Sequence, residues 1–289
     1  MRKITVTRYN LLGAIDEENE GVIINEIFYN DNGQEYERFH YDNEGELEEH
    51  IVNKIENGLI VEEVVEIQGE ESERTVRTFD DKGRVLTETR TYLEGGTDVT
   101  SYEYDGENLV LKHVVDTDGD EGEKEERQFE NGKLVKEVKY NLFGNPESER
   151  EYEYHEGGSV SEITETTYRD GLPERTVSFY DEQGHLTLEK KYDIKDRLVA
   201  RTTVIYNENG KAVSFEEENP RGKKVTTLGY DEQGNNITQE ETDEKGNRIS
   251  YVERTYSEEG ELTSAEIIME PSMYQSGQHY KLVYTYEKE

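Results

Sequence analysis

Turn-forming tetrads that end in glycine recur along almost the whole chain, most of them eleven to fourteen residues apart. Examples are Asp-Asn-Glu-Gly at residues 42–45 and Asp-Glu-Gln-Gly at residues 181–184. The Asp or Asn side chain bonds back to the chain and glycine adopts a positive φ, so each tetrad predicts a tight turn. Asp196 stands at one glycine position, where Asp tolerates a left-handed backbone at some cost. The glycines of the series are Gly13, Gly21, Gly33, Gly45, Gly58, Gly69, Gly83, Gly95, Gly106, Gly119, Gly132, Gly144, Gly158, Gly171, Gly184, Gly210, Gly222, Gly234, Gly246 and Gly260.

The segments between the turns have the length and composition of short strands. They are about eight residues long and rich in Thr, Val, Ile, Tyr and Glu, and no stretch keeps a helical apolar period over three turns. We therefore predict an all-β fold, a long antiparallel β-meander of about twenty short strands joined by tight turns. So long a twisted sheet is expected to curl or spiral as a repeat sheet, with an edge strand at each end. Composition does not break along the series, so residues 1–289 are expected to form a single β-repeat domain.

An aromatic residue precedes most turns, and an aliphatic residue follows it six positions later. A loop of four or five residues places the two side chains opposite each other on one face of a hairpin, where such a pair contributes roughly 0.2–1 kcal/mol. The pairs are Tyr9 with Ile15, Tyr41 with Leu47, Phe79 with Val85, Tyr154 with Val160, Tyr180 with Leu186, Tyr192 with Leu198, and Tyr256 with Leu262. The pairs Tyr104–Leu109 and Phe129–Leu134 are one residue shorter and Tyr230–Ile237 is one longer, which predicts altered turns or bulges there.

The charge of the chain restricts its partners. Asp and Glu number 69 against 33 Lys and Arg, a formal net charge of −36. Phosphate backbones and anionic membrane faces repel such a surface, so we expect neither nucleic acid nor membrane as a partner. A protein with a basic surface is the natural complement. Low hydrophobicity alone is typical of disorder, but 21 Tyr and 7 Phe oppose that interpretation.

Other compositional features bear on compartment. The chain contains no cysteine, which excludes disulfides, thiolate catalysis and zinc–thiolate sites. No stretch approaches the run of about 20 apolar residues that a membrane helix needs. The first residues lack the apolar core of a signal peptide. We expect a cytoplasmic protein, or a secreted or surface protein if a leader has been removed.

The residue types that usually carry chemistry occur without the spacing that the chemistry needs. None of the six histidines forms an H-x-H or H-x-x-x-H pair, and surface positions are expected for His40, His50, His113, His155, His185 and His279. With 69 acids, a pair of carboxylates at hydrolase distance arises by chance. Ser, His and Asp are present, but no G-x-S-x-G elbow occurs.

The acidic stretch Asp116–Gly122 resembles a calcium loop in its alternating acids. Its glycine comes too early for the EF-hand pattern, so a plain acidic turn is the favoured interpretation and a weak divalent site is left open. The sequence therefore predicts no catalytic residue, no cofactor-binding residue, no metal ligand and no cofactor, and a protein that is not an enzyme.

The stretch YDEQGNNITQEETDEKGNRISYVERTYSEEGEL, Tyr230–Leu262, resembles the YD repeats of RHS, Tc-toxin and teneurin proteins. The shorter stretches YDEQGHL and YDNEGEL, from Tyr180 and Tyr41, resemble the same motif. FENGKLVKEVKY, Phe129–Tyr140, is more weakly similar to MORN-type repeats of bacterial antitoxins. The YD-repeat resemblance implies a continuous spiralling sheet, which in that family often forms a shell around a toxin segment.

Charge, repeat pattern and resemblance lead to three functional hypotheses. The first is a non-enzymatic acidic β-repeat protein that binds other proteins, with a bacterial immunity or antitoxin-type neutraliser of a basic toxin as one specific case. The second is a structural scaffold or shell segment of a secreted or surface RHS-like assembly. The third, and least favoured, is a carboxylate-dependent hydrolase.

Overall fold

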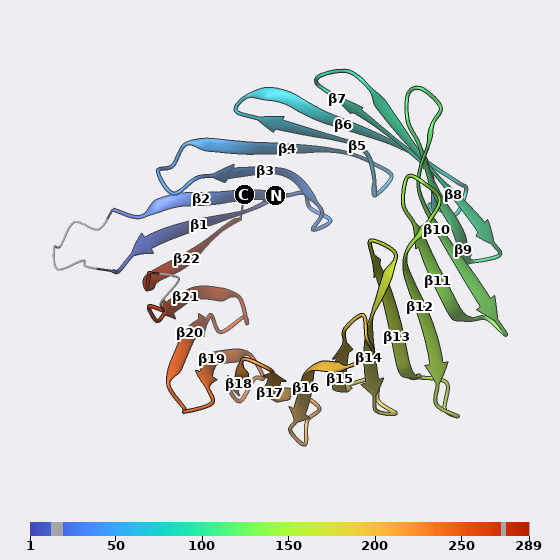
Figure 1. Cartoon of the computed structure of the whole chain (residues 1–289). Helices are drawn as coiled ribbons and strands as arrows, with labels where there is room; N and C mark the ends of the chain where they lie inside the picture. The colour runs from blue at the N-terminus through green and yellow to red at the C-terminus, as the bar shows by residue number, and fades with distance from the viewer. Residues whose placement is uncertain (13–19, 273–275, 289) are drawn as a thin grey trace. The chain divides into compact units, whose positions relative to one another are not determined.

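The computed structural model describes residues 1–12, 20–272 and 276–288, and these residues contain strands and turns but no helix (Figure 1). The predicted all-β antiparallel meander of short strands is confirmed. The strands are β1 (Arg2–Asn10), β2 (Val22–Tyr29), β3 (Glu35–Tyr41), β4 (Leu47–Glu56), β5 (Leu59–Ile67), β6 (Glu70–Phe79), β7 (Val85–Tyr92), β8 (Thr97–Asp105), β9 (Asn108–Val115), β10 (Glu121–Glu130), β11 (Lys133–Tyr140), β12 (Pro146–Tyr154), β13 (Val160–Arg169), β14 (Leu172–Tyr180), β15 (Leu186–Tyr192), β16 (Leu198–Tyr206), β17 (Ala212–Asn219), β18 (Gly222–Tyr230), β19 (Asn236–Asp243), β20 (Arg248–Tyr256), β21 (Leu262–Met269) and β22 (Gln278–Lys288).

The strands group into two compact units, each of which is described by itself. The first unit comprises Met1–Thr97, Leu228–Glu241 and Arg248–Glu289, and the second comprises Asp98–Thr227 and Thr242–Asn247. The expectation of one repeat domain over residues 1–289 stays a prediction. Among the described residues, no helix has the length and apolar character needed to cross a membrane.

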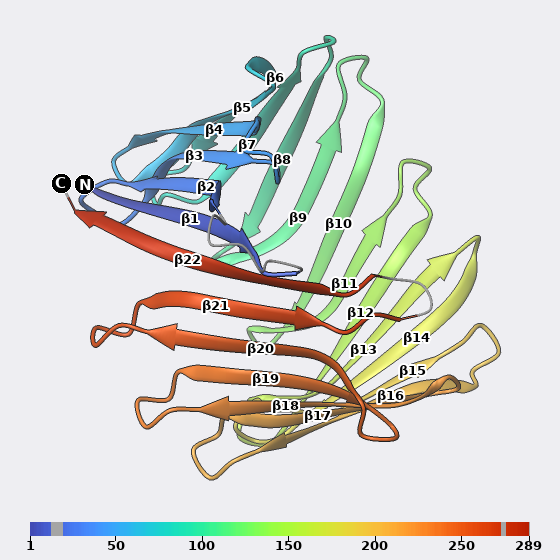
Figure 2. The same cartoon turned by 90° about the vertical axis from the view of Figure 1, so that its left-hand side faces the viewer.

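The expectation of a spiralling sheet with a free strand at each end is wrong. In the first unit, β1 pairs antiparallel with β2 on one side and with β22 on the other, from Arg2 opposite Lys288 to Asn10 opposite Tyr280. Figure 2 shows β22 lying beside β1. Strands β1 and β22 thereby hydrogen-bond the backbone N–H and C=O groups that each would otherwise expose at a sheet edge. Nothing in the repeat motif specifies this pairing of the first strand with the last.

The hairpin between β14 and β15 shows how the tetrads turn the chain. Asp181 N donates to His185 O at 3.0 Å, and Gly184 N donates to Asp181 O at 3.0 Å. Gly184 has φ of +85°, so a tight turn is followed by a left-handed residue and a bulge, one of the favoured hairpin connections. The Asp181 carboxylate also accepts the N–H groups of Gln183 and His185 at 3.0 and 2.8 Å. The same backbone pattern recurs at Asn30, Asp42, Asp80, Asp116, Asn141, His155, Asp193, Asn207, Asp231, Asp243 and Ser257.

Two glycine-series positions test the turn prediction. Asp196 has φ of +56°, as expected for a residue in a glycine position. Gly21 does not have a positive φ, and its role is different: a Cβ atom there would lie 2.5 Å from both Thr7 and Tyr9. Gly21 is therefore required for close packing rather than for a turn. Gly13 lies outside the described residues.

The predicted aromatic–aliphatic pairs lie opposite each other in the sheet. The confirmed pairs are Tyr41–Leu47, Phe79–Val85, Tyr104–Leu109, Phe129–Leu134, Tyr154–Val160, Tyr180–Leu186, Tyr192–Leu198 and Tyr256–Leu262. A β-bulge precedes the aromatic residue in each of them, not only in the irregular ones. Ile15, the partner expected for Tyr9, lies outside the described residues, and Tyr230–Ile237 stays a prediction.

The sheet has little buried core. In the first unit Val6, Thr75 and Ala265 are buried, and in the second Val138 and Val204 are among the few buried apolar residues. Most other described side chains on the strands are half-buried. Cross-strand contacts must therefore supply much of the cohesion that a thick apolar core supplies elsewhere.

Alternating charges form one such set of contacts in the second unit. Glu137 on β11 is buried, and its carboxylate lies 2.9 Å from Arg127 Nε on β10 and 3.6 Å from Arg150 Nη1 on β12. Arg150 continues the row to Glu165 on β13, at 2.9 Å. Cations of the strands are thus paired with acids inside the sheet, which leaves the surplus of acids for other positions.

The left-handed turn residues give a direct test of hairpin energetics. Gly184→Ala introduces no clash, because no atom lies within 4 Å of the added Cβ, but it forces a side chain into left-handed backbone. We expect a loss of about 1–2 kcal/mol in the free energy of unfolding, measured by urea denaturation. The matched control is Gly157→Ala, which also meets no atom but does not have a positive φ, and a similar loss there would contradict the explanation.

Candidate functional site

The hairpin loops of the second unit alternate between the two ends of its strands. Strands β11 to β16 pair in sequence order and antiparallel, so the loops that follow β12, β14 and β16 lie at one end. These loops are residues 155–159, 181–185 and 207–211, and their second residues are Glu156, Glu182 and Glu208. All three glutamates are exposed. We call the three loops the acidic end of the second unit.

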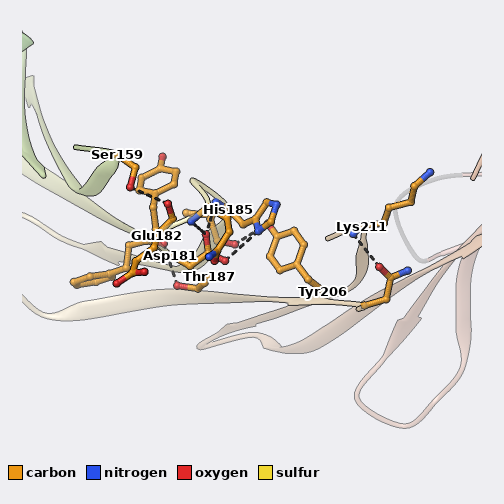
Figure 3. Close-up of polar contacts among 12 residues, drawn as sticks. Ser159, Asp181, Glu182, His185, Thr187, Tyr206 and Lys211 are labelled. Carbon is orange, nitrogen blue, oxygen red and sulfur yellow. Dashed lines mark hydrogen bonds and ion pairs between the residues drawn. The ribbon is translucent and has the colours of Figure 1, made fainter. Parts of the chain in front are cut away.

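Neighbouring loops of the acidic end are bonded to one another (Figure 3). His155 Nε2 lies 3.0 Å from the carbonyl oxygen of Tyr180, and Ser159 Oγ donates to the carbonyl oxygen of Glu182 at 3.0 Å. The His185 ring stacks on Tyr206 with 4.7 Å between ring centroids. These contacts hold the backbone that carries the glutamates, so their spacing is set before any partner arrives.

Asp181 and His185 form a hydrogen-bonded pair within one of these loops. Asp181 Oδ2 lies 3.0 Å from His185 Nδ1. The backbone N–H of His185, and then the His185 side chain, hold the pKa of Asp181 below its usual value. An aspartate–histidine pair occurs in hydrolytic triads, where the histidine activates a serine. Here the nearby Ser159 hydroxyl donates to a backbone carbonyl, and the pair positions the loop.

Tyrosine hydroxyls add a contact between neighbouring turns at one end of the strands, and the sequence analysis missed it. Tyr206 Oη donates to Leu186 O at 2.9 Å, so the last residue of β16 binds the first residue of β15. Burial raises the pKa of Tyr206. The same bond recurs for Tyr154 to Leu134 O, Tyr256 to Asn236 O and Tyr286 to Leu262 O. The bonds made by Tyr154, Tyr206 and Tyr256 each join residues twenty positions apart. That regular spacing was the signal available in the sequence.

Acids at the first and second loop positions have different surroundings. The first-position carboxylate of Asp231 bonds Asn235, and that of Asp243 bonds Asn247; these bonds hold both pKa values down. At Asp193 the Arg197 side chain is the main cause and lowers the pKa to about 2. The second-position glutamates Glu156, Glu182 and Glu208 make no side-chain hydrogen bond or ion pair with any residue in the described part of the chain.

The first unit repeats this arrangement on its own strands. Its loops after β6 and β20 carry Asp81 and Glu258 at the second position, and both side chains are exposed. The first positions, Asp80 and Ser257, bond backbone N–H groups of their loops. An acid at the second position is therefore a recurrent feature of loops that follow even-numbered strands.

The remaining residues that the sequence analysis singled out lie apart from the acidic end. Asp116 Oδ1 accepts the N–H groups of Asp118 and Asp120 at 3.0 and 2.9 Å, which is the bonding of a plain turn. Within residues 1–12, 20–272 and 276–288, no group of three His, Asp or Glu side chains is arranged to hold a metal ion. His40 lies 3.0 Å from Asn25, and His279 lies 2.7 Å from Glu266.

His50 lies between two carboxylates in the first unit. Its Nδ1 is 2.9 Å from Glu66 on β5, its Nε2 is 3.0 Å from Glu37 on β3, and its ring stacks on Phe39 at 4.2 Å. Partial burial lowers the pKa of the ring, but the hydrogen bonds to Glu66 and Glu37 outweigh burial and raise it overall. The His50 ring thus joins three adjacent strands.

The comparisons with known proteins give a likeness in architecture only. No family profile and no curated protein matches the chain. A chain in the Tc holotoxin pore of Photorhabdus luminescens is 15% identical with a TM-score of 0.36, and a chain in a TcdB2–TccC3 structure is 10% identical with a TM-score of 0.32. The alignments cover 90% and 93% of this chain but only 15% and 19% of those chains.

A porin-like protein from Bacteroides uniformis is 11% identical with a TM-score of 0.35, and the alignment covers 99% of this chain and 97% of that one. Likenesses with scores this low carry no argument about this chain. No sequence comparison confirms the YD repeats.

The tyrosine bond of the acidic end can be tested by removing one oxygen. Tyr206→Phe leaves Leu186 O without this partner, and we expect a loss of about 1 kcal/mol in the free energy of unfolding. The comparison variant is Tyr192→Phe, a pre-turn tyrosine whose ring contacts the Arg175 guanidinium. Equal losses in urea denaturation of the two variants would show that the Tyr206 hydroxyl has no special role.

The His50 contacts predict a pH-dependent contribution to stability. Because the folded pKa lies above the unfolded value of about 6.5, the contribution is fully present below that value and is lost as pH rises through the folded pKa. We expect His50→Gln to destabilise the protein more at about pH 6 than at about pH 9. The control is His155→Gln, whose ring bonds a backbone carbonyl. A His50→Gln loss that is constant with pH, measured by urea denaturation, would disprove the prediction.

Proposed function

We propose that this chain is a non-enzymatic binding protein that recognises basic proteins through the carboxylates of its acidic end. The observation that carries the proposal is the row Glu156, Glu182 and Glu208. These side chains are exposed at equivalent positions of three successive loops, while the first residues of two of these loops, Asp181 and Asn207, bond backbone N–H groups of the turn. Charge that takes no part in the fold is available to a partner.

The distribution of charge favours a cationic partner. Many of the 33 Lys and Arg side chains are paired with acids inside the sheet, as in the row from Arg127 to Glu165. The formal charge of −36 therefore acts through acids on loops and solvent-facing strand positions. Long-range attraction of this kind raises the rate of encounter with a basic protein and decreases as salt is added.

The distance between loops of the acidic end favours one kind of basic partner, a helix. Loops on one end of a meander are two strands apart, which is about 10 Å at the usual distance between strands. Basic residues seven positions apart on a helix repeat at a similar distance of about 10.5 Å. A helix with Lys or Arg on one face would therefore meet successive glutamates of the acidic end.

A basic toxin is one partner of this chemistry. An immunity or antitoxin-type neutraliser is thus the narrower form of the proposal, and it is supported by the sequence resemblance and by charge. The broader form requires only a basic protein surface.

The proposal is tested by neutralising the acidic end. In Glu156→Gln/Glu182→Gln/Glu208→Gln, we expect binding of an oligolysine peptide, measured by isothermal titration calorimetry at low salt, to weaken about tenfold. Three partly exposed contacts contribute roughly 0.2–1 kcal/mol each, which sums to a factor of that size. The affinity of the unaltered protein should fall steeply as salt is raised.

The control removes the same charge at the other end of the strands of the second unit. Asp118→Asn/Glu147→Gln/Asp170→Asn changes three exposed acids there. Equal weakening by the two triple variants would show that binding depends on total charge alone. No weakening by the first triple variant would remove the acidic end from the proposal.

A further inference from the structure

The opposite end of the second unit carries apolar side chains in place of acids. The connections that follow β11, β13 and β15 lie at this end, because these strands run parallel to one another in the antiparallel meander. Five large apolar residues on or beside these connections are exposed: Leu142 at 63%, Phe143 at 86%, Leu172 at 50%, Ile194 at 44% and Leu198 at 52%. We call this group the apolar end.

The conformation of these loops does not require apolar residues. Leu142 and Phe143 occupy the second and third positions of the loop that begins at Asn141, whose side chain accepts the N–H groups of Phe143 and Asn145. In the loop that begins at Asp181, the corresponding positions are Glu182 and Gln183. Single exposed apolar residues are ordinary, but five at one end of a strongly charged sheet indicate a surface that becomes covered.

Charge is nearly balanced in the connections that follow β11, β13 and β15. The loop of residues 141–145 contains no charged residue. In the loop that follows β15, Asp193 pairs with Arg197 at 2.6 Å, and Asp196 pairs with Arg175 at 2.7 Å. A surface with balanced charge is where a second molecule of charge −36 meets the least repulsion.

Two-fold contact through this surface also separates the acidic ends. In a symmetric dimer the apolar end of one copy contacts the apolar end of the other. In each copy the strands of the second unit then run from this contact toward the acidic end. The glutamates of the two acidic ends then lie at the far ends of their strands and remain exposed. Contact of apolar ends thus buries apolar area without bringing the acidic loops together.

We propose that the apolar end is a self-association surface through which two copies of this chain bind each other. Phe143 and Leu142 are its main anchors, because they are the most exposed members of the group and lie on one loop. The proposal concerns the opposite end from the acidic loops and does not depend on binding of a basic partner. Because repulsion between acidic chains opposes dimerisation, added salt strengthens it, whereas salt weakens binding at the acidic end.

Sedimentation equilibrium over a range of protein concentrations tests this surface. We expect reversible dimers that are favoured by salt, and at least an about tenfold higher dissociation constant for Leu142→Ser/Phe143→Ser. The matched control is Val76→Ser/Ile205→Ser, which removes two apolar side chains that lie on strands and are 43% and 45% exposed. This control should dimerise with the dissociation constant of the unaltered protein. A monomer at all concentrations and salt levels would overturn the proposal, as would equal weakening by the control.

The absence of tryptophan in the chain provides a second readout. Phe143→Trp places a single reporter at the apolar end, and its emission should shift to shorter wavelength as protein concentration rises and the indole leaves water. Ile205→Trp reports from a strand and should not shift with concentration. A Phe143→Trp spectrum that stays unchanged while dimers form would place the contact elsewhere and overturn the assignment.

Discussion

The hairpin corner is the interaction on which the rest of the structure depends. An Asx side chain bonds two backbone N–H groups of its own loop, a glycine or Asp196 follows in left-handed conformation, and a bulge places an aromatic ring opposite an aliphatic side chain. Each corner sets the register of the strands on either side. Because the corner is local, it forms the same hairpin wherever the tetrad occurs, and the meander is a succession of such corners.

A sheet built in this way needs other means of cohesion, since few of its side chains are buried. Bonds from tyrosine hydroxyls join adjacent strands next to their turns, and rows of alternating charges cross several strands. Pairing of β1 with β22 covers the edges that these two strands would otherwise offer to another chain. These contacts are individually modest, and their number is what allows so polar a chain to fold.

The corners also explain where the chain is free to vary. The first loop position bonds the backbone and the fourth needs left-handed conformation, so the second and third positions carry little structural constraint. In the second unit the second position carries a glutamate in three loops at one end of the strands, and at the other end it carries Leu142 and Ile194 in the loops that follow β11 and β15. This difference between the ends has no role in the turns, and for that reason we assign it to binding.

The sequence by itself determined the local features: the strands, their turns, the left-handed Asp196 and the opposition of pairs such as Tyr180 and Leu186. All of these depend on residues within one hairpin, where spacing alone specifies contact. Only the tertiary structure decided that β1 pairs with β22, that His50 joins Glu37 to Glu66, and that Tyr206 binds across a hairpin. The grouping of Glu156, Glu182 and Glu208 at one end likewise depends on strand pairing. Backbone N–H and C=O groups are alike in every strand, so sequence specifies which hairpins form but not which strands meet at the ends.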